Sequence, residues 1–297
     1  MTVGIGRLQV LVAAVLFSTG GAAIKAEAFS GVQVSALRSG IAAAILLVYL
    51  RRRLVLSTSL WATAAVYAAT LTLFVLATKL TTAANAIFLQ STAPLYVLLL
   101  GPVLLRERFQ ARDVAYLAAV AAGLILCVIG QPPQTTTAPD PARGNTLAVS
   151  CGVAWAFTLV GLRYVQRDQS GRSVGLSAVA IGNLIASAAA WPFAWPLPAA
   201  GAAEWATIVY LGVCQIALAY LFLTSAIRVL PALEVSLLLL IEPVLNPVWT
   251  WMIRDEQPGI STIAGGALVI AATGVKVVYD ARVPRANRNP RPQPQVP

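Results

Sequence analysis

The sequence predicts an all-α integral membrane protein with ten transmembrane helices as two inverted five-helix repeats and both termini cytoplasmic. Three observations predict this fold. First, 58% of the 297 residues are apolar and only 11% are charged, whereas about a quarter of a soluble domain is charged. Second, ten apolar runs approach the length of about 20 residues that a bilayer-spanning helix needs. Third, features of the first half of the chain recur in the second half.

The composition also excludes several classes of function. The chain has no His and three Cys, and the Cys lie in apolar runs without metal-ligand spacing, so we expect buried thiols, no metal and no cofactor. The net charge of +10 comes from Lys and Arg in short clusters between apolar runs, which argues against a nucleic-acid partner. No GxxxxGK loop is present and there is no His to act as a general base, so we expect no enzyme and no built-in ATPase.

The apolar runs are predicted to be helices, because open sheet edges are excluded from hydrocarbon. The first run follows Arg7 as a signal peptide would, but nine more runs follow it, so we expect it to be retained as a helix. The ten predicted spans lie near residues 7–25, 33–50, 60–78, 84–104, 114–130, 144–162, 174–193, 204–226, 232–253 and 260–279.

The positive residues between these spans predict the orientation. If the N-terminus is cytoplasmic, sixteen Lys and Arg residues fall in cytoplasmic segments and four in external ones. Cytoplasmic segments of membrane proteins are enriched in Lys and Arg. The bias therefore predicts cytoplasmic termini and a multi-pass protein of a bacterial plasma (inner) membrane.

The hydrophilic segments predict the boundaries between domains. Residues 131–143 contain four Pro and are expected to form an external linker. This linker separates a first five-helix repeat, residues 1–130, from a second, residues 144–279. Residues 280–297 are rich in Pro and Arg and are predicted to be a disordered cytoplasmic tail.

An internal repeat supports this division. The pairs that align at an offset of 149 are Lys79 with Arg228, Pro94 with Pro243, and Glu107 with Glu256. At an offset of 138, Phe17 aligns with Trp155 and Lys25 with Arg163. Because five spans is an odd number, the second repeat enters the membrane from the opposite side, an architecture typical of secondary transporters.

Several short motifs carry a family resemblance. They are Leu16-Phe17-Ser18, Ser91-Thr92-Ala93-Pro94, Arg106-Glu107-Arg108 and Gly123 in the first half, and Ala154-Trp155-Ala156, Glu242-Pro243-Val244, Asp255-Glu256, Gly265 and Gly274 in the second. With their order and spacing, residues 8–279 resemble the EamA-type drug/metabolite transporter superfamily and its ten-helix bacterial exporters of amino acids, including aromatic ones. The resemblance implies export of small metabolites through a central cavity by alternating access.

Two ionisable residues within the predicted spans are candidates for a functional role. Glu242 precedes Pro243 in the ninth span; it is either a proton-coupling or amine-binding carboxylate, or a structural group that forms an ion pair or bonds the backbone freed by the proline. Arg38 lies in the second span, and its alternatives are to reach outward to the head groups, to pair with Glu27, or to line the cavity.

The candidate substrate cavity combines polar and aromatic residues near the middle of the spans. They are Phe17, Ser18, Tyr67, Gln90, Ser91, Tyr96, Trp155, Asn183, Gln215, Tyr220 and Glu242. Prolines in equivalent spans of the two repeats predict helix kinks beside this cavity. They are Pro94, Pro102, Pro243 and Pro247. Trp191, Trp195, Trp205, Trp249 and Trp251 lie near span ends and are expected to be interface anchors.

These observations favour an exporter of neutral or aromatic amino acids, working as a monomer in contact with lipid and a small-molecule substrate. Export of nucleosides or cationic drugs is an alternative, and a membrane scaffold without transport activity is another. A cationic-drug site would require Glu242 to face the cavity. Phosphorylated cargo would require several basic residues within the spans, and only Arg38 is there.

Overall fold

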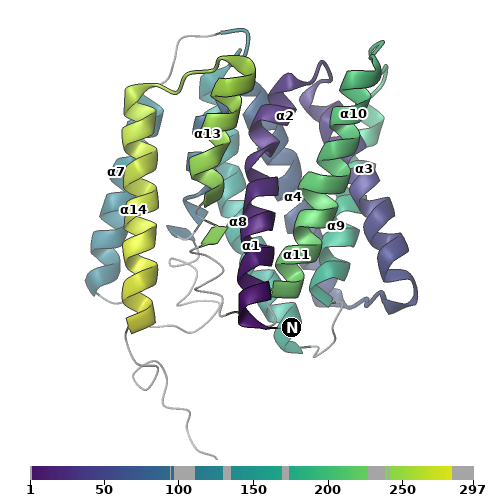
Figure 1. Cartoon of the computed structure of the whole chain (residues 1–297), viewed down its shortest axis with the longest axis horizontal. Helices are drawn as coiled ribbons and strands as arrows, with labels where there is room; N and C mark the ends of the chain where they lie inside the picture. The colour runs from purple at the N-terminus through teal and green to yellow at the C-terminus, as the bar shows by residue number, and fades with distance from the viewer. Residues whose placement is uncertain are drawn as a thin grey trace, which may run out of the picture.

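The computed structural model describes residues 2–93, 95–96, 111–129, 135–168, 174–226, 230, 238–239 and 241–282. All regular secondary structure in these ranges is helical. The helices run side by side in one bundle, with α7 and α14 at one edge and α3 at the other (Figure 1).

The helices follow the order of the predicted spans. In the first half they are α1 (Val3–Ser18), α2 (Gly20–Ala26), α3 (Gly31–Leu50), α4 (Thr58–Leu80), α5 (Ala83–Gln90) and α7 (Ala111–Ile129), with a 3-10 turn η1 (Arg51–Arg53). In the second half they are α8 (Pro141–Asp168), α9 (Val174–Ala190), α10 (Ala202–Tyr210), a π-helical segment η4 (Leu211–Leu218), α11 (Ala219–Ala226), α13 (Ile241–Arg254) and α14 (Ile260–Arg282), with a 3-10 turn η3 (Trp191–Phe193).

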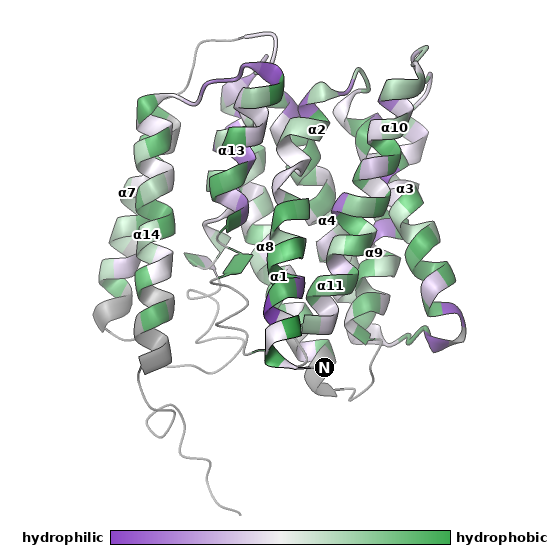
Figure 2. Ribbon diagram, in the orientation of Figure 1, coloured by the Kyte–Doolittle hydropathy of each residue, from purple (hydrophilic) through white to green (hydrophobic). Residues whose placement is uncertain are grey.

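Six helical segments of the described chain are long and apolar enough to cross a membrane. They are Val3–Ala26, Gly31–Leu50, Thr58–Leu80, Pro141–Leu162, Val174–Phe193 and Ala202–Ala226. Shorter apolar helices cover Val114–Leu126 and Ile260–Val275. Apolar residues dominate the helix flanks, and hydrophilic ones gather toward the helix ends (Figure 2). The chain is therefore a multi-pass membrane protein, for which ten crossings remain a prediction.

Two boundaries of the predicted domains differ from the helices. The helix α8 begins at Pro141, inside the predicted linker, because the Asp140 side chain accepts a hydrogen bond from the Arg143 N–H at 3.1 Å and proline suits the first helical position. At the other end α14 continues to Arg282, into the predicted tail. The rest of that tail lies outside the described residues.

Side-chain caps fix where several helices begin. The Ser30 hydroxyl accepts the Gln33 N–H at the start of α3, and the Gln33 side chain accepts the Ser30 N–H in return. The Ser57 and Thr82 hydroxyls likewise each accept a backbone N–H at the start of α4 and α5. These bonds satisfy N–H groups that have no acceptor within the helix.

Small residues let helices pack closely, as the Gly265-Gly266 pair predicts. A Cβ on Gly123 of α7 would lie 2.8 Å from the Gly265 carbonyl oxygen of α14, and one on Gly266 would overlap the Phe88 ring. Since neither position has room for a side chain, glycine is what allows α7, α14 and α5 to approach one another.

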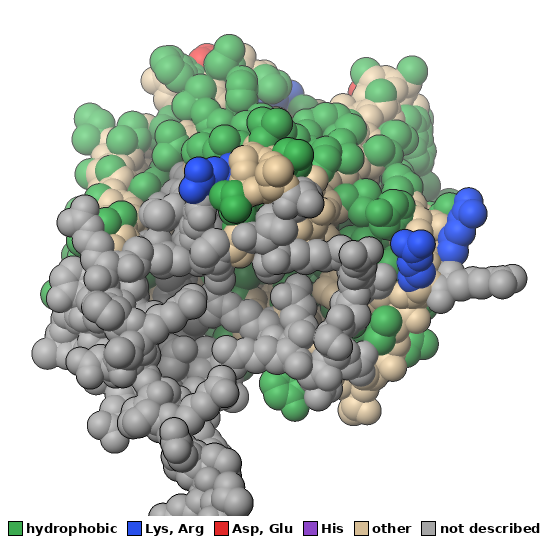
Figure 3. Space-filling model, turned by 60° about the horizontal axis from the view of Figure 1, so that its bottom comes forward, with side chains coloured by type: hydrophobic (Ala, Val, Ile, Leu, Met, Phe, Trp, Pro, Cys, Tyr) green, Lys and Arg blue, Asp and Glu red, His purple; other side chains and the backbone are tan. Residues whose placement is uncertain are grey.

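The end of the bundle that carries the N-terminus has exposed basic residues. Lys and Arg side chains stand at separate places on this face, and the flanks beside them are apolar (Figure 3). Arg7, Arg51 and Arg53 are all exposed. The positive-inside rule predicts that this end is cytoplasmic.

Candidate functional site

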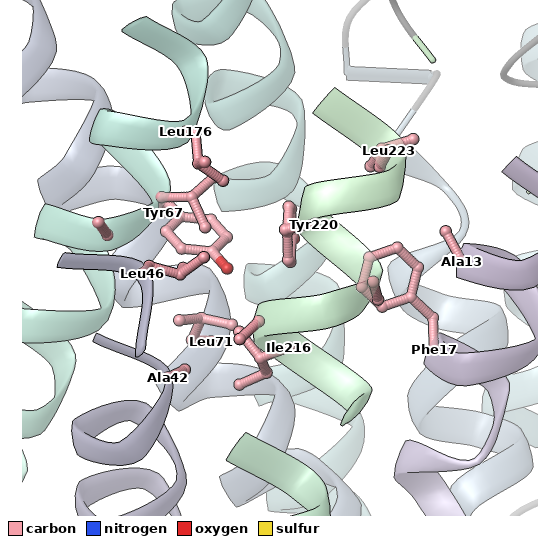
Figure 4. Close-up of a cluster of buried hydrophobic side chains, with 14 of the residues drawn as sticks. Ala13, Phe17, Ala42, Leu46, Tyr67, Leu71, Leu176, Ile216, Tyr220 and Leu223 are labelled. Carbon is pink, nitrogen blue, oxygen red and sulfur yellow. The ribbon is translucent and has the colours of Figure 1, made fainter. Parts of the chain in front are cut away.

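Three aromatic residues of the predicted cavity meet in the middle of the bundle. Tyr220 of α11 lies between Phe17 of α1 and Tyr67 of α4, with ring centroids 5.0 and 5.3 Å away and edge-to-face packing on both sides. The Tyr67 hydroxyl points toward Tyr220, and Phe17 approaches from the other side of α11 (Figure 4). All three rings are buried. The cluster joins helices from both halves of the chain, and such aromatic pairs add to the stability gained by burial.

Polar side chains of the predicted cavity surround this cluster. Asn183 of α9 is fully buried and donates to the Tyr67 hydroxyl at 3.4 Å, while its Oδ1 atom has no partner among the described residues. On the other side of α4, the Cys151 thiol donates to the Thr70 carbonyl oxygen at 3.3 Å and contacts Gln90 Oε1 at 3.6 Å. Polar groups are therefore present within the apolar interior of the bundle.

The contacts of Ser18 correct one prediction. Trp249 donates its indole N–H to the Ser18 hydroxyl at 2.9 Å and lies half-buried between α1 and α13. It is therefore not a membrane-interface anchor, in contrast to the exposed Trp191, Trp195 and Trp251. The sequence alone placed it near a span end but did not show which face of α13 it occupies.

The other predicted cavity residues lie apart from this cluster or are less buried. Ser91 bonds back to the Ile87 carbonyl oxygen within its own helix, and Tyr96 and Trp155 are half-buried. Pro94 and Pro102 lie outside the described residues.

Glu242 and Pro243 lie in the described part of the ninth predicted span. Glu242 is half-buried in the first turn of α13, which starts at Ile241. Pro243 is in that same turn, and because residue 240 lies outside the described residues, its role as a helix kink stays a prediction. Pro247 is inside the helix. The described residues supply no ion-pair partner for Glu242.

A pocket of about 350 Å³ lies between α2, α10 and α13. It is lined by Thr19, Ala22, Ala23, Ala26, Thr207, Tyr210, Trp249 and Ile253, so α2 forms one wall and α10 and α13 the other. The Thr19 hydroxyl meets the Tyr210 hydroxyl at 2.9 Å. None of the predicted cavity residues lines this pocket, although Trp249 links it to Ser18.

Arg38 is not among the residues that line this pocket. Its guanidinium donates to Gln215 Oε1 at 3.3 Å and to the Leu71 carbonyl oxygen at 3.1 Å. Two of the three sequence-based alternatives are therefore wrong: the side chain neither reaches outward nor pairs with Glu27. A Cβ on Gly20 would lie 2.8 Å from Gln215 Nε2, so glycine allows α2 to approach this contact.

A buried ion pair lies at one end of the bundle. Lys25, in the last turn of α2, lies 3.1 Å from Glu256, just beyond α13. The Lys25 ammonium also donates to the carbonyl oxygens of Thr81 and Thr137. Glu256 Oε1 accepts the Ala83 N–H at 2.6 Å, at the start of α5, where the helix dipole favours an anion. Four segments are thus joined at this point.

Lys79 and Glu27 extend this junction. Lys79 donates to the Glu27 carbonyl oxygen at 2.6 Å and so caps the C-terminal end of α2. Burial raises the pKa of the Glu27 carboxyl, against the opposing effects of a hydrogen bond to Thr207 and the charge of Lys79. Arg228, the equivalent of Lys79 in the repeat, lies outside the described residues.

The sequence did not single out the Lys25–Glu256 ion pair or Asn246 as site residues. Asn246 of α13 is fully buried, and neither polar atom of its amide has a partner among the described residues. Its side chain lies so close to Gly21 that a Cβ on that glycine would have no room. A polar residue between Pro243 and Pro247 was the available signal for Asn246. For the ion pair, the signal was the presence of both residues in the repeat.

The described residues contain no group of three or more His, Cys, Asp or Glu that could hold a metal ion. The arrangement instead offers hydrogen-bond donors and acceptors, aromatic rings and a small pocket between helices from the two halves. This combination can bind a small solute.

Comparison with known proteins shows what the chain is similar to. The EamA-like transporter family matches residues 4–129 and 142–277. The pseudopaline exporter CntI of Pseudomonas aeruginosa, strain UCBPP-PA14, is 27% identical over 191 residues, which cover 64% of each chain, and its counterpart in strain PAO1 matches equally. The chain thus spans about two thirds of the length of these relatives. A crystal structure with 22% identity superimposes with a TM-score of 0.64 over 93% of this chain and 98% of that chain, which shows a common fold.

Proposed function

Because the chain belongs to the EamA-like transporter family, we propose that it exports small metabolites across a bacterial inner membrane and that neutral or aromatic amino acids are its cargo. Its similarity to a pseudopaline exporter supports export of small metabolites. One repeat would move against the other around a binding site near the middle of the membrane. We expect a monomer to be sufficient, since both repeats are in one chain.

The pocket between α2, α10 and α13 is the observation that carries this proposal. Its volume of about 350 Å³ is at the small end of ligand sites, which span about 300–1,000 Å³. The lining is mostly apolar, and three hydroxyls, of Thr19, Thr207 and Tyr210, interrupt it. An aromatic or aliphatic side chain suits such walls. Glu242 does not line the pocket, which disfavours a cationic drug.

Filling this pocket should impair transport. The purified protein would be reconstituted in liposomes and loaded with unlabelled solute, and uptake would be measured for labelled aromatic, aliphatic and hydroxyl amino acids, a nucleoside and an organic cation. We expect saturable uptake of the aromatic amino acids. Ala23→Phe should raise the half-saturating concentration about tenfold, because overpacking costs about 1–3 kcal/mol.

The matched control is Ala62→Phe, which adds the same ring on an exposed position of α4 and should leave uptake unchanged. Uptake of the nucleoside or the cation without any amino-acid signal would contradict the proposed cargo but not the transport function. Equal effects of the two substitutions would show that the pocket is not on the transport path.

The role of Glu242 is tested in the same liposomes. We propose that it couples transport to protons, because it is a half-buried carboxylate without an ion-pair partner among the described residues. Uptake should then rise with a proton gradient in the parent protein. Glu242→Gln should remove the response to the gradient while counterflow without a gradient persists. Parent uptake that ignores the gradient would make Glu242 a structural residue.

A further inference from the structure

Arg38 is the largest of the fully buried side chains in the described part of the chain. It is 1% exposed and lies on α3, well inside a helix of 20 residues that is otherwise apolar apart from Gln33, Ser35 and Ser39. A charged group at such depth is costly and, in membrane proteins, marks a path or binding site for a charged solute more often than it serves packing. Arginine cannot avoid the cost by losing its proton, because the guanidinium is a very strong base.

The contacts of Arg38 leave its charge uncompensated. Both acceptors, Gln215 Oε1 and the Leu71 carbonyl oxygen, are neutral. The Nε atom is buried and has no hydrogen-bond partner among the residues that the structure describes. No carboxylate of the described residues pairs with the guanidinium. A buried cation that has only neutral acceptors and one unused N–H donor favours the binding of an anion.

Gln215 supplies a second donor beside the guanidinium. Since its Oε1 atom accepts from Arg38, its Nε2 group is directed toward α2, where Gly20 leaves the space that a Cβ would take. Gln215 lies in the π-helical segment η4, and such segments are frequent at functional sites because they shift a side chain out of helical register. A side chain at Gly212, in the same segment, would press on the Arg38 carbonyl oxygen at 2.9 Å.

This position is at the junction of the two halves of the chain. Arg38 and Gly20 belong to the first half and Gln215 to the second, and the Thr19 wall of the pocket directly precedes Gly20. An anion held here would contact both halves at once. A solute whose carboxylate binds Arg38 could therefore place its apolar part along α2.

We propose that Arg38, together with the Gln215 amide, binds the carboxylate group of the transported solute, so that the cargo is a carboxylate-bearing metabolite. This inference rests on the proposed transport function and narrows its cargo. A forked guanidinium donates hydrogen bonds to both oxygens of a carboxylate at once, whereas a nucleoside or an organic cation has no group that would compensate the charge.

The experiment compares solutes that differ only in the carboxylate. Liposomes loaded with phenylalanine, phenylalaninamide or phenethylamine would be assayed for counterflow of the same labelled compound. The parent protein should transport phenylalanine and discriminate against the other two. In Arg38→Met, phenylalanine transport should fall at least about 100-fold, with little change for phenethylamine. Arg38→Lys should recover part of it, because a point charge keeps the attraction but not the fork.

A second measurement does not depend on transport. In detergent, phenylalanine should raise the melting temperature of the parent protein and of the exposed control Ala62→Phe, but not of Arg38→Met or, if that variant does not fold, Gln215→Met. Transport of phenethylamine as good as that of phenylalanine would overturn the carboxylate site while leaving the transport function intact. Parent protein that neither transports nor is stabilised by any carboxylate would overturn it as well. Stabilisation by phenylalanine without transport would support the site and count against the proposed function.

Discussion

Glu256→Gln is expected to lower the free energy of unfolding by about 3–5 kcal/mol, the usual cost of removing one partner of a buried ion pair. The Lys25 and Glu256 side chains are only 2% and 5% exposed, and they lie 3.1 Å apart. The amide would leave the Lys25 ammonium buried without its counter-charge. It would also weaken the bond to the Ala83 N–H, which starts α5. The ion pair joins the two halves of the chain, so its loss should also loosen this end of the bundle.

Denaturant unfolding in detergent micelles, followed by circular dichroism, would measure this cost. The matched control is Asp255→Asn, since Asp255 is exposed and has a positive φ of 52°, a conformation that asparagine tolerates well. It should be neutral. Replacing both Lys25 and Glu256 with Met should be less damaging than Glu256→Gln alone, because no charge then remains buried. Equal stability of Glu256→Gln and Asp255→Asn would contradict the importance of the ion pair.

Tyr67→Ala should cost a similar amount, about 3–5 kcal/mol, because it leaves a cavity in the middle of the bundle. Tyr67 is almost completely buried and packs edge-to-face against Tyr220. Its hydroxyl also accepts the Asn183 side-chain N–H. The substitution therefore removes the ring that links α4 to α11 and leaves a buried amide without that partner.

Two further variants separate these contributions. Tyr67→Phe keeps the ring and should cost about 1–3 kcal/mol, the penalty for leaving a buried donor unsatisfied. Tyr49→Ala removes the same side chain from a position that is 63% exposed, and it should be close to neutral. If Tyr67→Ala were no more damaging than Tyr49→Ala in the same unfolding assay, the aromatic cluster would not stabilise the bundle.

Much of the fold followed from the sequence because membrane helices obey local rules. Each of the six membrane-length helical segments overlaps a predicted span, since about 20 apolar residues in hydrocarbon have few alternatives to a helix. The helix ends were less predictable. The start of α8 at Pro141 depends on a cap by Asp140, and the division of one span into α10, η4 and α11 has no signal in hydropathy.

The candidate site was predictable only in part. The three aromatic residues of the cluster do meet, namely Phe17, Tyr67 and Tyr220. A residue near the middle of a span faces either the lipid or the interior of the bundle, and these three face the interior. Ser91 shows the limit, since a hydroxyl is equally satisfied by the carbonyl oxygen one turn earlier in its own helix. Trp249 shows another limit, because its position near a span end did not reveal its hydrogen bond to Ser18.

The sequence by itself determined that this is a helical, multi-pass membrane protein of the EamA-like family, because apolar length, charge clusters and motif order are all properties of the chain read in one dimension. The tertiary structure decided what each buried polar group contacts. Arg38 had three alternatives in the sequence, and the packing of α3 against η4 selected Gln215 as its partner. Lys25 and Glu256 are 231 positions apart in the chain, and only the folded bundle brings them to 3.1 Å. Such contacts depend on which faces of distant helices meet, and hydropathy along one helix does not contain that information.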